Sequence, residues 1–215
     1  SAPVGFEPGE KGAYSNTNYV LLGWIVEAVT GQDLASCIAE RITGPLEMTR
    51  TLVGDGIDPA DDEARSQTWA GVAWKDATET HPSVPGGAGA VVSTPTDLCR
   101  FGRALFEGEL LDSDGLASMQ TLDDAYGRGL FRFPFHDRWS WGHTGGIDGF
   151  SSMLGYFPDD GSCVAIVTHG NNLLTRDQNQ LAIDALTVAN GGRVKDRAVE
   201  PVLVLTADQL RPFVG

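Results

Sequence analysis

The stretch best suited to chemistry is Tyr14-Ser15-Asn16, which lies between a turn rich in proline and glycine and an apolar pattern with helical spacing. A tyrosine and an asparagine one residue apart on such a loop can point the same way. An ionised phenol then accepts a proton beside an amide that donates and accepts hydrogen bonds. The same residues also suit a structural role, in which Ser15, Asn16 or Thr17 caps the next helix and Tyr14 packs beside it. Taken alone, the tripeptide favours the helix cap.

A second candidate stretch surrounds His143-Thr144, where four glycines fall within residues 142–149. Glycines allow a backbone to approach a ligand closely at the edge of a strand. Without other information, the pattern is equally typical of a glycine-rich turn that contains a histidine by chance.

The amino-acid composition limits the kinds of molecule that the protein is expected to bind. The 215 residues suffice for one domain, or for one domain with a subdomain. A formal net charge of −14, with only three lysines, argues against nucleic acid or an anionic membrane surface as a partner, since these need clustered Lys and Arg. No apolar run is long enough to span a membrane, and no signal peptide is apparent at Ser1.

The three cysteines, Cys37, Cys99 and Cys163, are odd in number and widely spaced inside apolar patterns. Such residues usually pack as small buried hydrophobic side chains rather than forming bridges or holding metals. The chain contains no Cys-x-x-Cys and no His-Glu-x-x-His pattern. We therefore expect neither a metal ion nor another cofactor.

Apolar spacing and capping signals predict the helices. They cover residues 19–30, 34–42, 95–106, 113–119 and 175–190. Thr94 is the predicted cap of the third helix and Ser113 of the fourth, and Gly31 is expected to end the first.

The remaining patterns predict strands and one long irregular segment, residues 52–85, which we call the excursion. Strands are expected over residues 126–133, 139–142, 150–157 and 163–168, the last two forming an antiparallel hairpin. Residues 52–85 lack periodicity and carry one short predicted strand at 67–74. Helices followed by antiparallel strands and a covering helix indicate an α+β domain. Its sheet of three or four strands is small for so much helix, which would leave one sheet edge unpaired.

Taken together, Tyr14-Ser15-Asn16 and His143-Thr144-Gly145 resemble the second and third motifs of the serine β-lactamase and penicillin-binding-protein superfamily. Within the superfamily, the chain most resembles the branch of class C β-lactamases, DD-carboxypeptidases and esterases, where these motifs are Tyr-Ser/Ala-Asn and Lys/His-Thr-Gly. It covers roughly residues 5–190 and implies an antiparallel sheet flanked by helices with a helical subdomain at about 15–125. The implied domains are a catalytic domain over 1–195, and a linker with a truncated segment over 196–215.

The resemblance also implies roles for individual residues. Tyr14 matches the general base, and Asn16 the amide that holds the acyl-side carbonyl of the substrate. His143 stands where many relatives have lysine, beside Thr144 and Gly145, which contact substrate. Gly146 matches the residue whose N–H forms half of the oxyanion hole. Histidine supplies less positive charge than lysine at neutral pH, and in the family it is associated more with peptidases and esterases than with efficient β-lactamases.

The first family motif, Ser-x-x-Lys, is missing, because none of the three lysines has a serine three residues before it. We therefore expect a domain that is incomplete at its N-terminus, with the nucleophile in the uncut protein or on another chain. Ser1 as an N-terminal nucleophile is a weaker alternative.

The resulting functional hypothesis is a serine hydrolase that forms an acyl-enzyme with an ester, an amide or a D-amino-acid peptide. The alternative is a non-catalytic module that binds peptides or other ligands in the same cleft. The expected partner is a small-molecule or peptide substrate and not nucleic acid, and no feature indicates an oligomeric state. The resemblance favours an extracytoplasmic or secreted location, as in relatives that act on cell-wall peptides.

Overall fold

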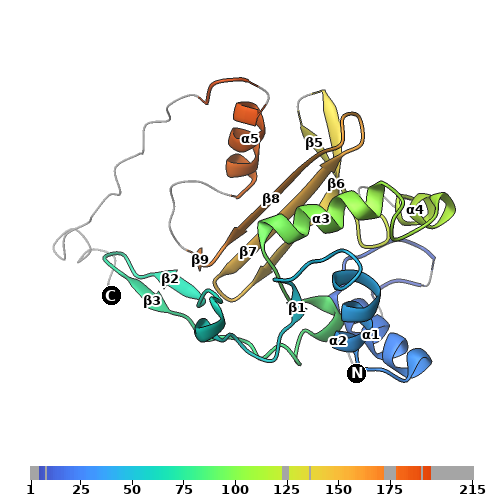
Figure 1. Cartoon of the computed structure of the whole chain (residues 1–215), viewed down its shortest axis with the longest axis horizontal. Helices are drawn as coiled ribbons and strands as arrows, with labels where there is room; N and C mark the ends of the chain where they lie inside the picture. Colours follow the sequence, from blue (N-terminus) through green and yellow to red (C-terminus); the bar gives the residue numbers. More distant parts are fainter. Residues whose placement is uncertain are drawn as a thin grey trace.

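The computed structural model describes residues 5–7, 9–122, 126–135, 137–171, 178–189 and 191–194 (Figure 1). The helices are α1 (Asn16–Thr30), α2 (Leu34–Ile38), α3 (Pro95–Phe106), α4 (Ser113–Met119) and α5 (Gln178–Ala189), with short helical turns η1 (Ala39–Thr43), η2 (Pro59–Asp61) and η3 (Gly86–Ala88). The strands are β1 (Leu52–Val53), β2 (Gln67–Trp69), β3 (Trp74–Asp76), β4 (Val91–Val92), β5 (Phe131–Phe135), β6 (Arg138–Ile147), β7 (Phe150–Phe157), β8 (Ser162–Thr168) and β9 (Gly170–Asn171). The predicted α+β class is confirmed.

The predicted helices are present, with differences at their ends. Gly31 ends α1 in the left-handed conformation at φ 69°, and the Thr94 side chain caps α3, both as predicted. The cap of α4 is Asp112, whose carboxylate accepts from the Gly115 N–H, so the prediction of Ser113 as cap was wrong. The predicted helix over 34–42 divides into α2 and the wider π-helical turn η1. The predicted start of α5 at residue 175 lies outside the described residues.

The main sheet is antiparallel, in the order β5-β6-β7-β8. The strand predicted over 126–133 begins later, because Gly129 turns the chain at φ 79° and Tyr126 makes only an isolated bridge to Phe131. The strand predicted over 139–142 is longer, since β6 continues to Ile147 in register with β7. The glycine-rich stretch around His143 is therefore strand rather than turn.

Two helices pack against the main sheet, on opposite sides of it in Figure 1. Both α3 and α5 contact β7 and β8. Phe106 of α3 stacks on Tyr156 with ring centroids 4.7 Å apart. The next residue on β7, Phe157, points to the other face of the sheet and is 1% exposed, with Phe135 against it at 5.7 Å. The core thus lies on both faces of β7.

The helical region is held together by a close approach of two backbones. Gly23 of α1 lies against Gly87 of η3, where a Cβ at residue 87 would come 2.4 Å from the Tyr19 carbonyl oxygen. Only glycine fits there, which explains the glycine-rich segment before α3. Outside this contact, α1 leaves large apolar side chains exposed, including Trp24 and Val29. No helix in the described part of the chain combines the length and apolarity needed to cross a membrane.

The long excursion forms small sheets of its own. Strand β1 pairs with β4, while β2 and β3 form a hairpin whose first strand also pairs in parallel with β9 (Figure 1). The single strand predicted over 67–74 was wrong, because residues 70–73 form the turn between β2 and β3. The rings of Trp69 and Trp74 meet edge to face across this hairpin, 5.4 Å apart.

The excursion is tied to the turn between β6 and β7. The Thr80 N–H and hydroxyl both donate to the Asp148 carboxylate, at 2.7 and 2.9 Å. The next N–H, that of Gly149, donates to the hydroxyl of Ser66, a side chain with no exposed surface. These bonds place the excursion next to the end of β6.

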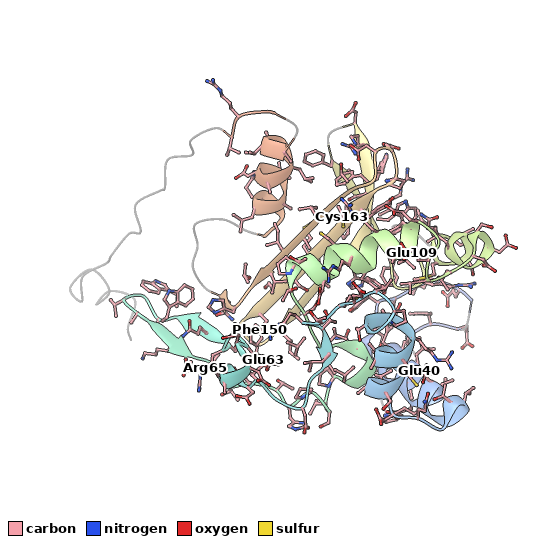
Figure 2. The ribbon with its side chains drawn as sticks, viewed as in Figure 1. Glu40, Glu63, Arg65, Glu109, Phe150 and Cys163 are labelled. Carbon is pink, nitrogen blue, oxygen red and sulfur yellow. The ribbon has the colours of Figure 1, made fainter. Side chains whose placement is uncertain are left out.

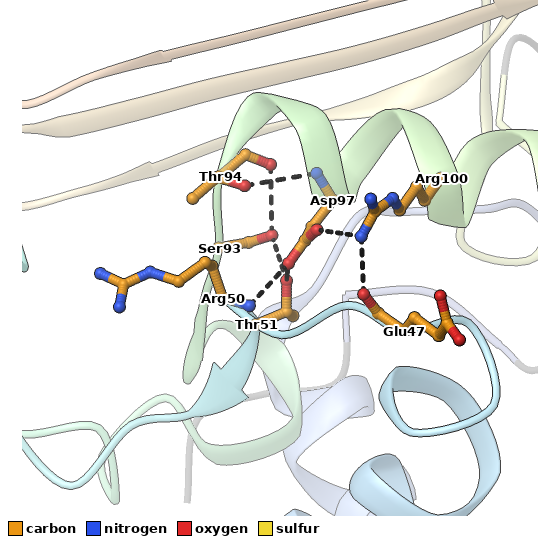
Figure 3. A network of polar contacts seen from close by, with 7 residues as sticks. All are labelled: Glu47, Arg50, Thr51, Ser93, Thr94, Asp97 and Arg100. Carbon is orange, nitrogen blue, oxygen red and sulfur yellow. Dashed lines mark hydrogen bonds and ion pairs between the residues drawn. The ribbon is translucent and has the colours of Figure 1, made fainter.

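A buried carboxylate joins α3 to the start of the excursion (Figure 3). Asp97 is 3% exposed and accepts hydrogen bonds from the Arg50 N–H at 2.9 Å and the Thr51 hydroxyl at 3.0 Å. The guanidinium of Arg100, one turn further along α3, forms an ion pair with the Asp97 carboxylate, with Nη1 and Oδ1 3.4 Å apart. A buried carboxylate is stable only when its oxygens are bonded in this way.

We predict that Asp97→Ala lowers the free energy of unfolding by about 2–4 kcal/mol, because the Arg50 N–H and Thr51 hydroxyl lose their acceptor inside the protein. Urea unfolding measures the loss. The matched control is Asp76→Ala, which removes an exposed carboxylate 3.8 Å from Arg65 and should have little effect. Equal losses in the two variants would contradict this role for Asp97.

We also predict that Asp148→Ala speeds hydrogen exchange at the Thr80 amide about tenfold, since a hydrogen bond to a charged acceptor contributes about 1.5 kcal/mol. Asp148→Asn keeps an acceptor and suits the positive φ of 53° at this position, so it should change exchange less. Asp55→Ala, which removes an exposed carboxylate 3.6 Å from His81, is the control. An unchanged exchange rate of the Thr80 amide in Asp148→Ala would show that Asp148 does not hold the excursion against the turn between β6 and β7.

Candidate active site

Tyr14 lies just before α1, with its ring inside a group of aromatic side chains. Its hydroxyl donates to Asn16 Oδ1 at 2.8 Å, so the two residues of the first candidate stretch point toward each other. Its ring centroid is 5.8 Å from Tyr126, 6.4 Å from Phe131 and 6.2 Å from His143. We call these four rings (Tyr14, Tyr126, Phe131 and His143) the aromatic cluster. Tyr14 itself remains 56% exposed, which leaves its hydroxyl accessible.

The prediction that this stretch caps α1 is correct for the backbone only. Ser15 is the N-cap residue of α1, but its side chain makes no capping hydrogen bond. Tyr14 packs against residues more than 100 positions away rather than along its own helix. The tertiary contacts, and not the helix end, therefore set the orientation of Tyr14.

His143 lies half-buried on β6, and its two nitrogens have different partners. Nδ1–H donates to the backbone carbonyl of Thr144. A carbonyl only accepts, so Nδ1 carries the proton and Nε2 of the neutral ring is an acceptor. Nε2 faces the Tyr126 hydroxyl at 3.5 Å. This pairing selects one tautomer of the imidazole.

Tyr126 was not predicted from the sequence as a site residue. Its hydroxyl lies 2.9 Å from that of Tyr19 and 3.5 Å from His143 Nε2. Burial raises the pKa of Tyr126, and the hydrogen bond with Tyr19 raises it further, so this phenol keeps its proton. The Tyr126 hydroxyl thus lies between the Tyr19 hydroxyl and His143 Nε2.

Phe131 was missed as well. Its ring centroid lies 4.9 Å from His143 and 4.4 Å from Tyr126. The only sequence signal for these two residues is their position around the Gly-Arg-Gly turn that leads into β5. Nothing in the spacing alone places that turn beside His143.

Three residues of the second candidate stretch continue along β6, and all are exposed: Thr144, Gly145 and Gly146. At Gly145 a Cβ would come 2.4 Å from Ser152 Oγ of β7, so a larger residue there would require the Ser152 hydroxyl to move. At Gly146 the same Cβ would meet nothing closer than 4.0 Å. The space in front of Gly146 is therefore open to a ligand.

The second half of β6 has a free edge. Strand β5 pairs with β6 only as far as Gly142, whereas β7 pairs with it up to Ile147. In the described part of the chain, residues 143–147 thus have a strand partner on one side only. Backbone groups on the other side can bind an extended substrate as an added strand would.

The arrangement combines a phenol, an amide and an imidazole beside an open strand edge. Such groups can move a proton and hold a carbonyl, but none of them is an activated serine or cysteine nucleophile. Within the described ranges, no group of three or more His, Cys, Asp or Glu side chains is placed to hold a metal ion.

Known proteins share this architecture. Penicillin-binding protein 4* of Bacillus subtilis (strain 168) is 30% identical over 170 residues, which cover 69% of this chain and 38% of that protein. A D-stereospecific amidohydrolase from Streptomyces sp. superposes with a TM-score of 0.73 at 31% identity, over 84% of this chain and 56% of that structure. D-amino acid amidase from Ochrobactrum anthropi SV3 superposes with a TM-score of 0.73 at 28% identity, over 86% of this chain and 60% of that structure.

This chain spans less than two thirds of the length of each of these relatives. The sequence model of the beta-lactamase family matches residues 1–189. With a match over most of its length and an α+β fold that superposes on penicillin-binding-protein-like hydrolases, the chain belongs to the beta-lactamase family.

Proposed function

We propose that the protein containing this chain is a serine hydrolase that acts through an acyl-enzyme, and that this chain supplies one wall of its active site. The observation that carries the proposal is the meeting of Tyr14, Asn16 and His143 beside the free edge of β6. The nucleophilic serine and its lysine would come from a segment outside residues 1–215. Family membership supports the reaction class.

Tyr14 is the proposed general base. With its proton lost, the phenolate takes the proton of the serine hydroxyl as the serine attacks the substrate carbonyl, and returns that proton to the leaving group. In the present arrangement the Tyr14 hydroxyl keeps its proton and donates a hydrogen bond to Asn16 Oδ1, which describes the resting form. Nearby positive charge favours the ionised phenol, and the lysine of the missing motif would supply it.

The other groups position the substrate. The Asn16 amide would hold the acyl-side carbonyl, and Thr144 and Gly145 would contact the substrate along β6. The open space in front of Gly146 suits an oxyanion that accepts from its N–H. The hydrogen bonds to both ring nitrogens hold His143 in one orientation beside Tyr14.

D-amino-acid amides or peptides are the substrates favoured within this class. Two structural relatives are a D-stereospecific amidohydrolase and a D-amino acid amidase. An amide substrate has the N–H and C=O groups that an open strand edge can bind. The family resemblance favours a location outside the cytoplasm, and this location stays a prediction.

The test is to label the longest protein that contains this chain with a fluorophosphonate and with a fluorescent penicillin, and to map the modified peptide. We expect one labelled serine, outside residues 1–215 and followed three residues later by lysine. Absence of labelling by both probes would overturn the hydrolase proposal in favour of a binding module. Labelling of Ser1 in a chain that begins at this residue after self-cleavage would instead make it an N-terminal nucleophile.

In that protein, Tyr14→Phe should lower kcat on a D-amino-acid amide by about 10²-fold or more, since a positioned general base contributes that much. The fold should persist, as the ring contacts remain. Tyr156→Phe, which removes a hydroxyl from the α3 side of the sheet, is the matched control and should retain near-normal kcat. Normal kcat in Tyr14→Phe would exclude Tyr14 from the proton transfer.

A further inference from the structure

Two cysteines predicted to be buried hydrophobic side chains meet between α3 and β8. The thiols of Cys99 and Cys163 lie close enough to shift each other's pKa, and both are free. Gly102, one turn after Cys99 on the same face of α3, lies against Cys163, where a Cβ at residue 102 would come 3.2 Å from Sγ. Figure 2 shows Cys163 on β8 beside α3. The helix and the strand are thus close enough at this point for the two sulfurs to interact.

The surroundings make the two thiols unequal. The hydrogen bond from Cys163, aided by the positive charge of Arg103, lowers the pKa of Cys99 to about 7. The same hydrogen bond, with burial, raises the pKa of Cys163, and Glu107 and Tyr156 also lie nearby. Thiolates are the nucleophiles in disulfide exchange, so Cys99 would react first and Cys163 second.

Exposure separates this pair from the third cysteine. Cys99 and Cys163 are both half-buried, which leaves them within reach of a small reagent. Cys37 is 4% exposed, and among the described residues its sulfur has Thr30 and Gln32 as polar partners. The prediction of a buried hydrophobic side chain therefore fits Cys37 but not the pair.

We propose that Cys99 and Cys163 form a reversible disulfide by exchange with a small disulfide of the oxidised glutathione class, which links α3 to β8. The Cys99 thiolate attacks one sulfur of the small disulfide, whose S–S bond breaks and releases one thiolate. Cys163 then loses its proton to solvent and attacks the Cys99 sulfur, which releases the second small thiol. The protein loses two electrons and two protons, and the small disulfide is reduced to two thiols.

The cross-link would add a covalent bond between α3 and β8, which are held together by packing and by the contact of these two thiols. It closes a loop of about 60 residues, and closing such a loop restricts the unfolded chain and stabilises the folded one. Because β8 pairs with β7 and β7 with β6, the link fixes α3 to the sheet that carries His143. None of the proposed catalytic residues takes part in this exchange, so its test does not depend on the proposed function.

The test exploits the tryptic peptides, which hold one cysteine each: 12–41, 76–100 and 139–176. After incubation with oxidised glutathione and alkylation of the remaining thiols, we expect 76–100 and 139–176 to be joined, and 12–41 to be alkylated. Dithiothreitol should separate the pair. The oxidised protein should have a Tm higher by about 5 °C or more. A stable glutathione adduct on Cys99, or a link to Cys37 or to a second molecule, would overturn the proposal.

Single variants test the order of reaction. Cys163→Ser should trap glutathione on Cys99, while Cys99→Ser should leave Cys163 largely unmodified. The control Cys37→Ser should still form the cross-link. In the unchanged protein, the rate of Cys99 alkylation by iodoacetamide should reach half its maximum near the pKa of about 7, below the value of about 8.5 for an ordinary thiol. Faster modification of Cys163 than of Cys99 would contradict the mechanism.

Discussion

The antiparallel pairing of β6 with β7 is the contact on which the rest of the site depends. A Cβ at Gly142 would come 1.8 Å from the Leu154 carbonyl oxygen, so any larger residue would force the strands apart. At Gly145, further along the pair, a Cβ would meet only the side chain of Ser152. The resulting register puts His143 just beyond the last residue that β5 pairs. A shift by one residue would turn the imidazole to the opposite face, away from the aromatic cluster.

The helices could be predicted because their signals are local. Gly31 ends α1 and Thr94 caps α3 through atoms only a few residues away, so the sequence around each end contains all that is needed. The misassigned cap of α4 shows the limit of this reasoning, since Asp112 and Ser113 are both good caps and differ by one position. The split into α2 and η1 had no comparable local signal.

The strands and the site were predictable only in part, because their causes are long-range. Glycines weaken an isolated strand, so the stretch around His143 reads as a turn until β7 is placed beside it. Motif order suggested that Tyr14 and His143 belong together, and their rings are indeed 6.2 Å apart. Tyr126 reaches His143 only through the path of the chain into β5, which no spacing rule describes. Asp97 and Asp148 likewise bind segments that are distant in sequence.

The parallel pairing of β2 with β9 has a consequence for the order in which the molecule assembles. The bonds from Gly149 to Ser66 and from Thr68 to Asn171 join residues 83 and 103 positions apart, whereas β6, β7 and β8 pair with their neighbours in the chain. Distant contacts carry the cost of closing long loops, so the meander of β5, β6, β7 and β8 should form early and the excursion should dock late. The segment that docks last is also the one that can open first while the sheet remains intact. Local opening of the excursion would therefore expose the surface beside the end of β6.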